Sequence, residues 1–132
     1  MTHPQDPEIV EVQSAYAFAP TLDRLTAAIE GAGITIFARI DHAAGAQSVG
    51  TPMPPAVVLI YGAAKGGTPI MLAAPQAALD LPLRVLVREA EDGVVLVAFH
   101  PVAAMLRRAG VPDALAIRLD PAQHLLVEAV KA

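Results

Sequence analysis

The chain contains no cysteine, and aromatic residues make up only 4% of its 132 residues. Without cysteine it can form neither disulfides nor thiolate metal sites, and thiol catalysis is excluded. Because aromatic side chains are scarce, leucine, valine, isoleucine and alanine must fill the core. Alanine fills little space, so helices and strands have to pack closely.

Charge is also sparse, with 17% charged residues and a formal net charge of −4. The arginines are scattered, and Arg107-Arg108 is the only clustered pair. A nucleic-acid partner is therefore excluded, because binding phosphates requires a basic patch. Apolar residues reach 55%, above the usual share, so we expect a second subunit to cover part of the surface.

Long apolar runs are missing as well: none approaches the roughly 20 residues that span a bilayer. Residues 1–12 are polar and acidic, unlike a signal peptide. The sequence therefore predicts a soluble, cytoplasmic protein without a membrane partner. Its length predicts one domain over residues 9–132, preceded by a flexible arm over residues 1–8.

Apolar periodicity and turn residues predict an α+β fold with an antiparallel-rich mixed sheet covered by helices. A hairpin turn at residues 91–93 argues against a plain parallel sheet. The predicted strands cover residues 9–18, 34–41, 56–61, 83–89 and 94–99. The predicted helices cover residues 21–32, 69–74, 101–110 and 121–131, and residues 113–119 fit either type.

Three finer expectations concern single residues. Ile34, Ile36, Ala38 and Ile40 are expected to share the core face of their strand, because side chains alternate. Pro20 is expected to end the first strand before the first helix begins. Asp120 and Gln123 are expected to form a capping box at the start of the last helix.

A glycine-rich turn that carries a lone lysine is predicted at residues 62–68, between a buried strand and an apolar helix. Two adjacent glycines let a ligand approach the backbone, and a helix capped by Thr68 and starting at Pro69 would present free N–H groups. These features favour binding of a carboxylate or phosphate. Alternatively, the glycines only make a tight connection and the lysine is solvated. The candidate ligand-binding residues are Lys65, Gly66, Gly67 and Thr68.

Asp41 and His42 form a second candidate site at the end of a predicted strand. Asp41 could orient His42 or act as a base, with Lys65 stabilising negative charge. Alternatively, Asp41 caps the turn that starts at His42. Arg84 and Arg88 could bind an anion together, but a solvated or dimer-interface face is favoured. No metal site and no cofactor are predicted, since the histidines lack ligand spacing.

Several motifs resemble those of the "domain of unknown function 302" (DUF302) family, in family order over roughly residues 15–130. They are IDHAAGA at 40–46, MPP at 53–55, LIYGAAKGGTPIM at 59–71, ALDLPLRVLV at 78–87 and FHP at 99–101. The resemblance implies a TATA-binding-protein-like α+β fold and a homodimer, and it implies no activity. Where members usually have Asn-Pro, this chain has Ala63-Ala64.

Three functions are thus open at the level of sequence. The leading one is a non-catalytic module that binds a small anionic or amphipathic ligand at residues 62–68. The second is an enzyme that uses Asp41 and His42 for proton transfer beside Lys65, which requires one shared cavity. The third is a purely structural dimer.

Overall fold

The computed structural model describes residues 9–132, so the predicted arm at residues 1–8 lies outside the described residues. The strands are β1 (Val10–Gln13), β2 (Thr35–Asp41), β3 (Ala56–Gly62), β4 (Leu83–Glu89) and β5 (Val95–Phe99). The α-helices are α1 (Phe18–Gly31), α2 (His42–Ser48), α3 (Ala64–Ala73), α4 (Val102–Arg108), α5 (Asp113–Ala116) and α6 (Asp120–Ala129). Two 3-10 helices, η1 (Pro75–Asp80) and η2 (Ile117–Leu119), complete the elements.

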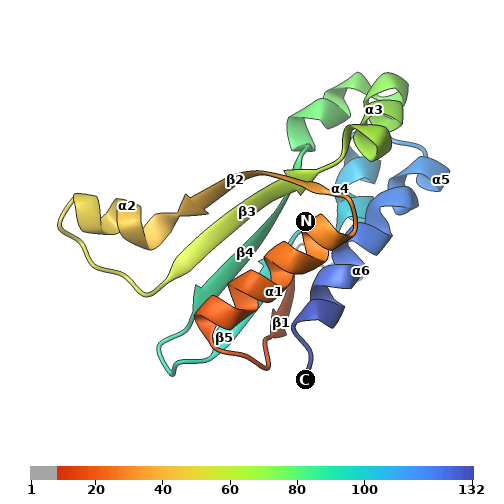
Figure 1. Cartoon of the computed structure of the whole chain (residues 1–132). Coiled ribbons are helices and arrows are strands. Elements are labelled where there is room, and N and C mark those ends of the chain that lie inside the picture. The colour runs from red at the N-terminus through yellow and green to blue at the C-terminus, as the bar shows by residue number, and fades with distance from the viewer. Residues whose placement is uncertain (1–8) are drawn as a thin grey trace.

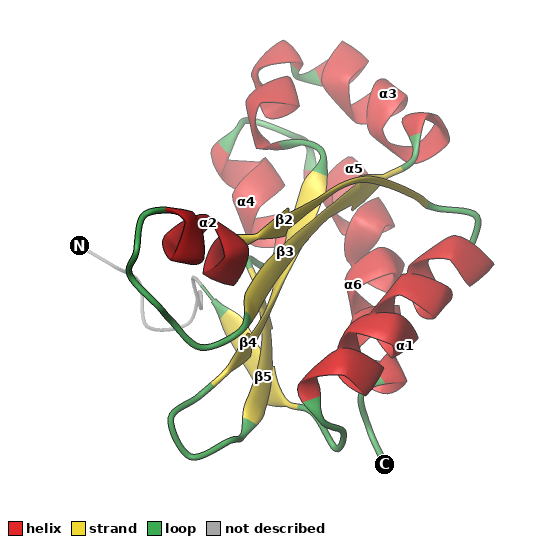
Figure 2. Cartoon of the chain, turned by 60° about the vertical axis from the view of Figure 1, so that its left-hand side comes forward, coloured by secondary structure: helices red, strands yellow, loops and turns green. Residues whose placement is uncertain are grey.

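The five strands form one sheet in the order β1-β5-β4-β3-β2, and each pairing between neighbours is antiparallel. Helices α1 and α6 lie side by side against it (Figure 1). Figure 2 shows these two helices on one side of the strands, while α2 projects away from them. The predicted α+β class is confirmed. Residues 113–119, which fitted either type of element, are helical.

The core lies between the sheet and the layer formed by α1 and α6. Leu22, Leu25 and Ile29 recur at helical spacing along α1 and are at most 2% exposed. They belong to the same cluster as the alternate inward-facing residues of β3, β4 and β5. Each fully buried aliphatic side chain of this kind contributes roughly 1.5–3 kcal/mol, so this layer carries much of the stability.

The other side of the sheet presents a row of aliphatic side chains that lie outside the core cluster. The strand register places Ile40, Val58, Leu86 and Ala98 next to one another, with Glu11 at the β1 edge. Ile40 is 41% exposed, Val58 and Leu86 are half-buried and Ala98 is buried; none of these residues belongs to the core cluster. These five residues define what we call the open sheet face.

Strand β2 does not keep one face throughout, so the prediction of a common core face for its residues is wrong. The register shifts between Ile36 and Ala38, which indicates a bulge at Phe37. Ile36 pairs with the buried Tyr61, whereas Ala38 pairs with Ile60 on the opposite side. A bulge inserts one extra residue, and so it reverses the alternation of every residue that follows.

Helix α1 begins earlier than predicted, because Pro20 lies inside its first turn rather than before it. N–H groups in the first turn have no helical acceptor, so a proline is accepted there. The hydroxyls of Ser14 and Thr21, 2.6 Å apart, and a bond from Thr21 to the Tyr16 carbonyl at 3.2 Å hold the preceding turn. The first strand is therefore shorter than the predicted residues 9–18.

The predicted capping box at the start of the last helix is wrong. Leu119 is the N-cap of α6, and no side chain caps it. Gln123, only 6% exposed, instead accepts a bond from the Val102 N–H at 2.8 Å and donates one to the His100 carbonyl at 2.7 Å. Gln123 therefore ties α6 to the start of α4.

Candidate functional site

The glycine-rich segment forms the first turns of helix α3 rather than a turn before it. The helix begins at Ala64 with Ala63 as its N-cap. The predictions of Thr68 as N-cap and Pro69 as first helical residue are therefore wrong. The N-cap therefore lies five residues earlier than predicted, although each glycine in a helix costs about 1 kcal/mol relative to alanine.

The backbone donors expected to bind an anion are already used inside this helix. The N–H groups of Gly66 and Gly67 both donate to the Ala63 carbonyl at 3.0 Å. The side chains of Lys65 and Thr68 are exposed. The two glycines therefore offer no free N–H groups to a carboxylate or phosphate, and this part of the prediction is wrong.

A pocket of about 360 Å³ nevertheless lies beneath the same segment. Four parts of the chain form its wall: the β2 region, the end of β3 with helix α3, the start of β4, and the region around residue 120. The lining residues are Ile34, Phe37, Tyr61, Gly62, Ala63, Ala64, Gly66, Gly67, Thr68, Met71, Leu81, Pro82, Leu83, Leu119 and Ala122. Gly66, Gly67 and Thr68 contribute to the wall, whereas Lys65 does not. No lining residue carries a formal charge at neutral pH. We call this hollow the α3 pocket.

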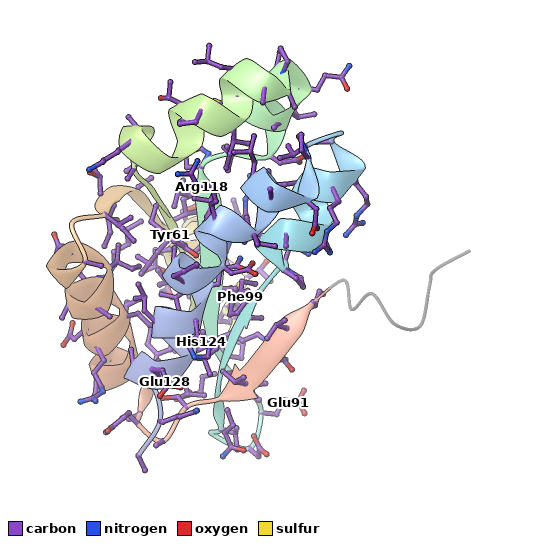
Figure 3. The ribbon with its side chains drawn as sticks, turned by 90° about the vertical axis from the view of Figure 1, so that its right-hand side faces the viewer. Tyr61, Glu91, Phe99, Arg118, His124 and Glu128 are labelled. Atoms are coloured by element: carbon purple, nitrogen blue, oxygen red, sulfur yellow. The ribbon has the colours of Figure 1, made fainter. Side chains whose placement is uncertain are left out.

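Tyr61 belongs to the wall of the α3 pocket, and its hydroxyl is buried. It is the sixth residue of β3, lines the pocket, and is 0% exposed. Figure 3 shows it in the interior of the molecule. Its hydroxyl has no hydrogen-bond partner among residues 9–132, and burial raises the pKa of the phenol well above its usual value. Tyr61 is therefore a neutral, unpaired polar group in an apolar wall.

The two glycines of α3 serve close packing within the protein. A Cβ atom on Gly66 would lie 3.2 Å from Leu119 Cδ2, tighter than an ordinary contact. A Cβ atom on Gly67 would lie 3.7 Å from Met71 Cε and 3.8 Å from Leu81 Cδ1, both ordinary contacts. Gly66 thus allows α3 to approach η2, and a longer side chain on Gly67 would occupy the α3 pocket.

Asp41 and His42 lie at the opposite end of β2 and β3 from the α3 pocket. Asp41 pairs with Val57, whereas Thr35, at the other end of β2, pairs with Gly62. The six residue steps from Thr35 to Asp41, at about 3.3 Å each, separate the two ends by roughly 20 Å. The Asp41 carboxylate accepts a bond from Ala44 N–H at 2.9 Å and so caps α2. The enzyme hypothesis required one cavity with Lys65, and this geometry contradicts it.

A smaller hollow of about 260 Å³ contains more polar side chains than the α3 pocket. Asp80, Arg84, His100 and Gln123 are among its lining residues. The amide of Gln123 is engaged on both its oxygen and its nitrogen. No group of three or more histidine, aspartate or glutamate side chains within residues 9–132 is arranged to hold a metal ion.

Reasoning from the sequence identified one wall of the α3 pocket and missed Tyr61. A tyrosine in an otherwise aliphatic buried strand was an available signal, because a buried phenol usually has a hydrogen-bond partner. The wall residues Leu119 and Ala122 could not be inferred, since no local pattern links residues 62–68 to residues about 50 positions later.

A family model described as "Domain of unknown function DUF302" matches residues 10–132. The chain belongs to the DUF302 family. A crystal structure of an uncharacterized conserved DUF302 protein from Bacillus stearothermophilus superimposes with a TM-score of 0.80 at 14% sequence identity. The match covers 93% of this chain and 95% of that one, so the two share the DUF302 fold.

Two curated relatives are longer proteins. This DUF302 chain is 34% identical over 103 residues to a protein named fluoride-specific ion channel FluC 1 in Brucella suis, and equally to its namesake in Brucella abortus. The matched segment covers 78% of this chain but only 41% and 38% of those proteins. None of the helices in residues 9–132 has both the length and the apolar character needed to cross a bilayer.

Proposed function

We propose that this DUF302 domain is a binding module that holds a small, mainly apolar molecule in the α3 pocket. The observation that carries the proposal is the pocket itself: an uncharged hollow of about 360 Å³ beneath the segment singled out by the sequence. Ligand sites are commonly concave, mostly apolar and supplied with few polar groups. The pocket matches that description in volume and in lining.

The proposed ligand is amphipathic or apolar rather than anionic inside the pocket. Gly66, Gly67 and Thr68 line the pocket, while Lys65 is exposed and outside its wall. A buried anion would have no positive side chain beside it, and burying an unpaired charge is very costly. A charged end of the ligand would therefore face solvent, near Thr68.

Substitution of Gly67 by leucine tests this proposal. The Cβ position of Gly67 is sterically permitted, so the longer side chain is expected to enter the α3 pocket without disrupting α3. With the hydrocarbon α-methylstyrene as probe, the wild type should show saturable shifts of the Met71 methyl signal in NMR titrations, and the variant should show none. Lys65→Ala should bind as the wild type does.

Gly45→Leu is the matched control, because Gly45 also lies inside a helix and has no atom within 4 Å of its Cβ position. It should leave the titration unchanged. If the wild type does not bind the probe, or if Gly67→Leu binds it as well as the wild type, the binding proposal is wrong. A purely structural role would then remain.

The proposal includes a homodimer formed through the open sheet face. Four aliphatic residues lie there in one row, and Arg84 and Arg88 extend from the same side. An Arg88–Glu11 pair at 3.5 Å crosses the face, with both side chains about 40% exposed. A two-fold axis matches a surface with itself, so arginines of one copy can face Glu11 of the other across an apolar centre.

Apolar residues make up 55% of the chain, and the dimer would cover part of the apolar surface that they create. We further propose that the protein is cytoplasmic and bacterial. The bacterial sources of the relatives named above support the bacterial origin. Fluoride conduction belongs to the longer relatives, of which this chain matches less than half.

A further inference from the structure

The buried hydroxyl of Tyr61 constrains the chemistry of any molecule in the α3 pocket. The register pairs Tyr61 with Ile36 and Leu83, and all three residues pack in or against the core cluster. The phenol is therefore directed toward the helices, where its oxygen is buried and has no partner among the described residues. A buried polar group without a hydrogen bond raises the free energy of the folded protein.

The wall of the α3 pocket offers this hydroxyl few acceptors. Apart from Tyr61, its only side chain with a polar oxygen or nitrogen is Thr68, which is exposed. The start of α3, where Ala63 and Ala64 line the pocket, has no side-chain cap, and a helix start presents N–H donors. The polar groups of the wall therefore favour an acceptor on the ligand.

The same wall contains no positive side chain, so an acceptor that is an anion would be poorly compensated. Burial also keeps the phenol protonated, because its pKa is raised. The hydroxyl therefore remains a donor at neutral pH. An uncharged oxygen, as in a ketone, an ester or an ether, is the group that fits.

We propose that the ligand of the α3 pocket carries an uncharged hydrogen-bond acceptor, and that Tyr61 donates its hydroxyl proton to it. This inference rests on the proposed binding function and names the ligand class. The oxygen of Tyr61 is closed off from solvent, so a wall side chain has to move before a ligand can reach it. Met71 lines the same pocket and has a flexible side chain, so it is the side chain proposed to move.

Two probes of nearly equal shape test this inference. Acetophenone and α-methylstyrene differ only in an oxygen that replaces a methylene group, so the pair isolates the acceptor. The wild type should bind acetophenone about tenfold more tightly, which corresponds to a net hydrogen bond of about 1.4 kcal/mol. Tyr61→Phe should bind both probes equally, with the affinity for α-methylstyrene unchanged. Affinities are measured by NMR titration of the Met71 methyl signal.

Tyr16→Phe is the control, because Tyr16 is the only other tyrosine and its hydroxyl bonds to the Lys131 carbonyl at an exposed position. It should keep the tenfold preference. Tyr61→Phe should also melt at the same temperature as the wild type or higher, because an unpaired group is removed.

The outcomes separate this inference from the function on which it rests. If the wild type binds both probes equally, the pocket is a binding site and the role of Tyr61 is wrong, as when a bound water already pairs with the hydroxyl. If a preference exists but persists in Tyr61→Phe, the acceptor is recognised elsewhere and the inference is likewise wrong. If neither probe binds, both proposals fall.

Discussion

Two buried polar side chains, Gln123 and Tyr61, affect the folded molecule in opposite ways. Gln123 uses its amide oxygen and nitrogen in two backbone hydrogen bonds that join α6 to α4. Tyr61 has no partner within the described residues. A satisfied buried group stabilises the fold and an unsatisfied one weakens it. Gln123 therefore has a structural role, and the unpaired hydroxyl of Tyr61 is the basis of the binding role proposed for it.

At this scale we predict that Gln123→Leu destabilises the protein by about 1–3 kcal/mol. Leucine has a similar volume, but it leaves the buried Val102 N–H without its acceptor. Urea unfolding followed by circular dichroism measures the loss. Gln47→Leu is the control: Gln47 is exposed on α2, and its unfolding free energy should change by no more than about 0.5 kcal/mol. Equal effects of both variants would contradict the assigned role of Gln123.

Predictions for single residues were accurate where the interaction joins residues that are close in the sequence. Asp41 caps α2, which was one of the two predictions made for it. Gln123 was assigned to a cap on its own helix, yet it serves the start of α4, 21 residues earlier in the chain. That bond depends on how α4 and α6 pack, and no pattern along the chain encodes it.

At the scale of elements, the start of helix α3 is where this chain has Ala63-Ala64 in place of the family's usual Asn-Pro. Ala63 is the N-cap and Ala64 the first helical residue, the positions at which the resemblance expects asparagine and proline. Asparagine is a favoured N-cap and proline a favoured first residue. The usual Asn-Pro therefore fits a structural role in starting this helix, and its replacement leaves the start uncapped.

We accordingly predict that Ala63→Asn stabilises the protein by about 0.5–2 kcal/mol, because the asparagine side chain can accept a bond from an N–H of the first turn. The backbone of Ala63 is already extended, with φ of −136° and ψ of 129°, as an N-cap requires. The gain is measured by urea unfolding and by slower hydrogen exchange in α3.

The converse substitution, Asp41→Ala, removes the existing cap of α2. It should speed hydrogen exchange in α2 and change global stability little, because α2 has no buried residue and can open locally. If Ala63→Asn gave no gain while Asp41→Ala showed its expected loss, the first turn of α3 would already be satisfied by another group.

The type of most elements was predictable from periodicity, whereas their ends and faces were not. Strand β2 was identified over nearly its full length, yet the bulge at Phe37 transfers Ala38 and Ile40 to the open sheet face. An extra residue in a ladder leaves no mark in the alternation of isoleucines that precedes and follows it. The pattern consequently predicted a core role for residues that lie outside the core.

At the scale of the whole molecule, we predict that the protein sediments as a dimer and that Leu86→Glu converts it to a monomer. Leu86 lies in the middle of the open sheet face, where a carboxylate would replace an aliphatic side chain and would lose its hydration on dimerisation. Analytical ultracentrifugation measures the change, and circular dichroism confirms that the variant is folded.

Leu79→Glu is the matched control, because Leu79 is 86% exposed on η1, away from that face, and it should remain a dimer. A wild-type monomer would contradict the proposed interface. A dimer that survives Leu86→Glu would place the contact elsewhere. If deletion of residues 1–8 from a monomeric wild type produced the dimer, those residues would be the occupant of the open sheet face instead.

The α3 pocket is formed by segments that are distant in the sequence, so only the wall at residues 62–68 could be predicted. Composition and glycine spacing drew attention to residues 62–68, and the fold placed a pocket there. The opposite wall comes from residues near position 120, brought close by the packing of α6 against α1. Tertiary packing of this kind can be derived only from the folded molecule.

The pairing of β1 with β5 also sets the order in which the strands of the sheet can pair during folding. Val10 pairs with Phe99, and β5 is the only sheet neighbour of β1 within residues 9–132. During synthesis, β1 must therefore wait for its partner until residue 99 has been translated. The β2–β3 and β3–β4 ribbons can form before that moment, and the N-terminal edge of the sheet is closed last.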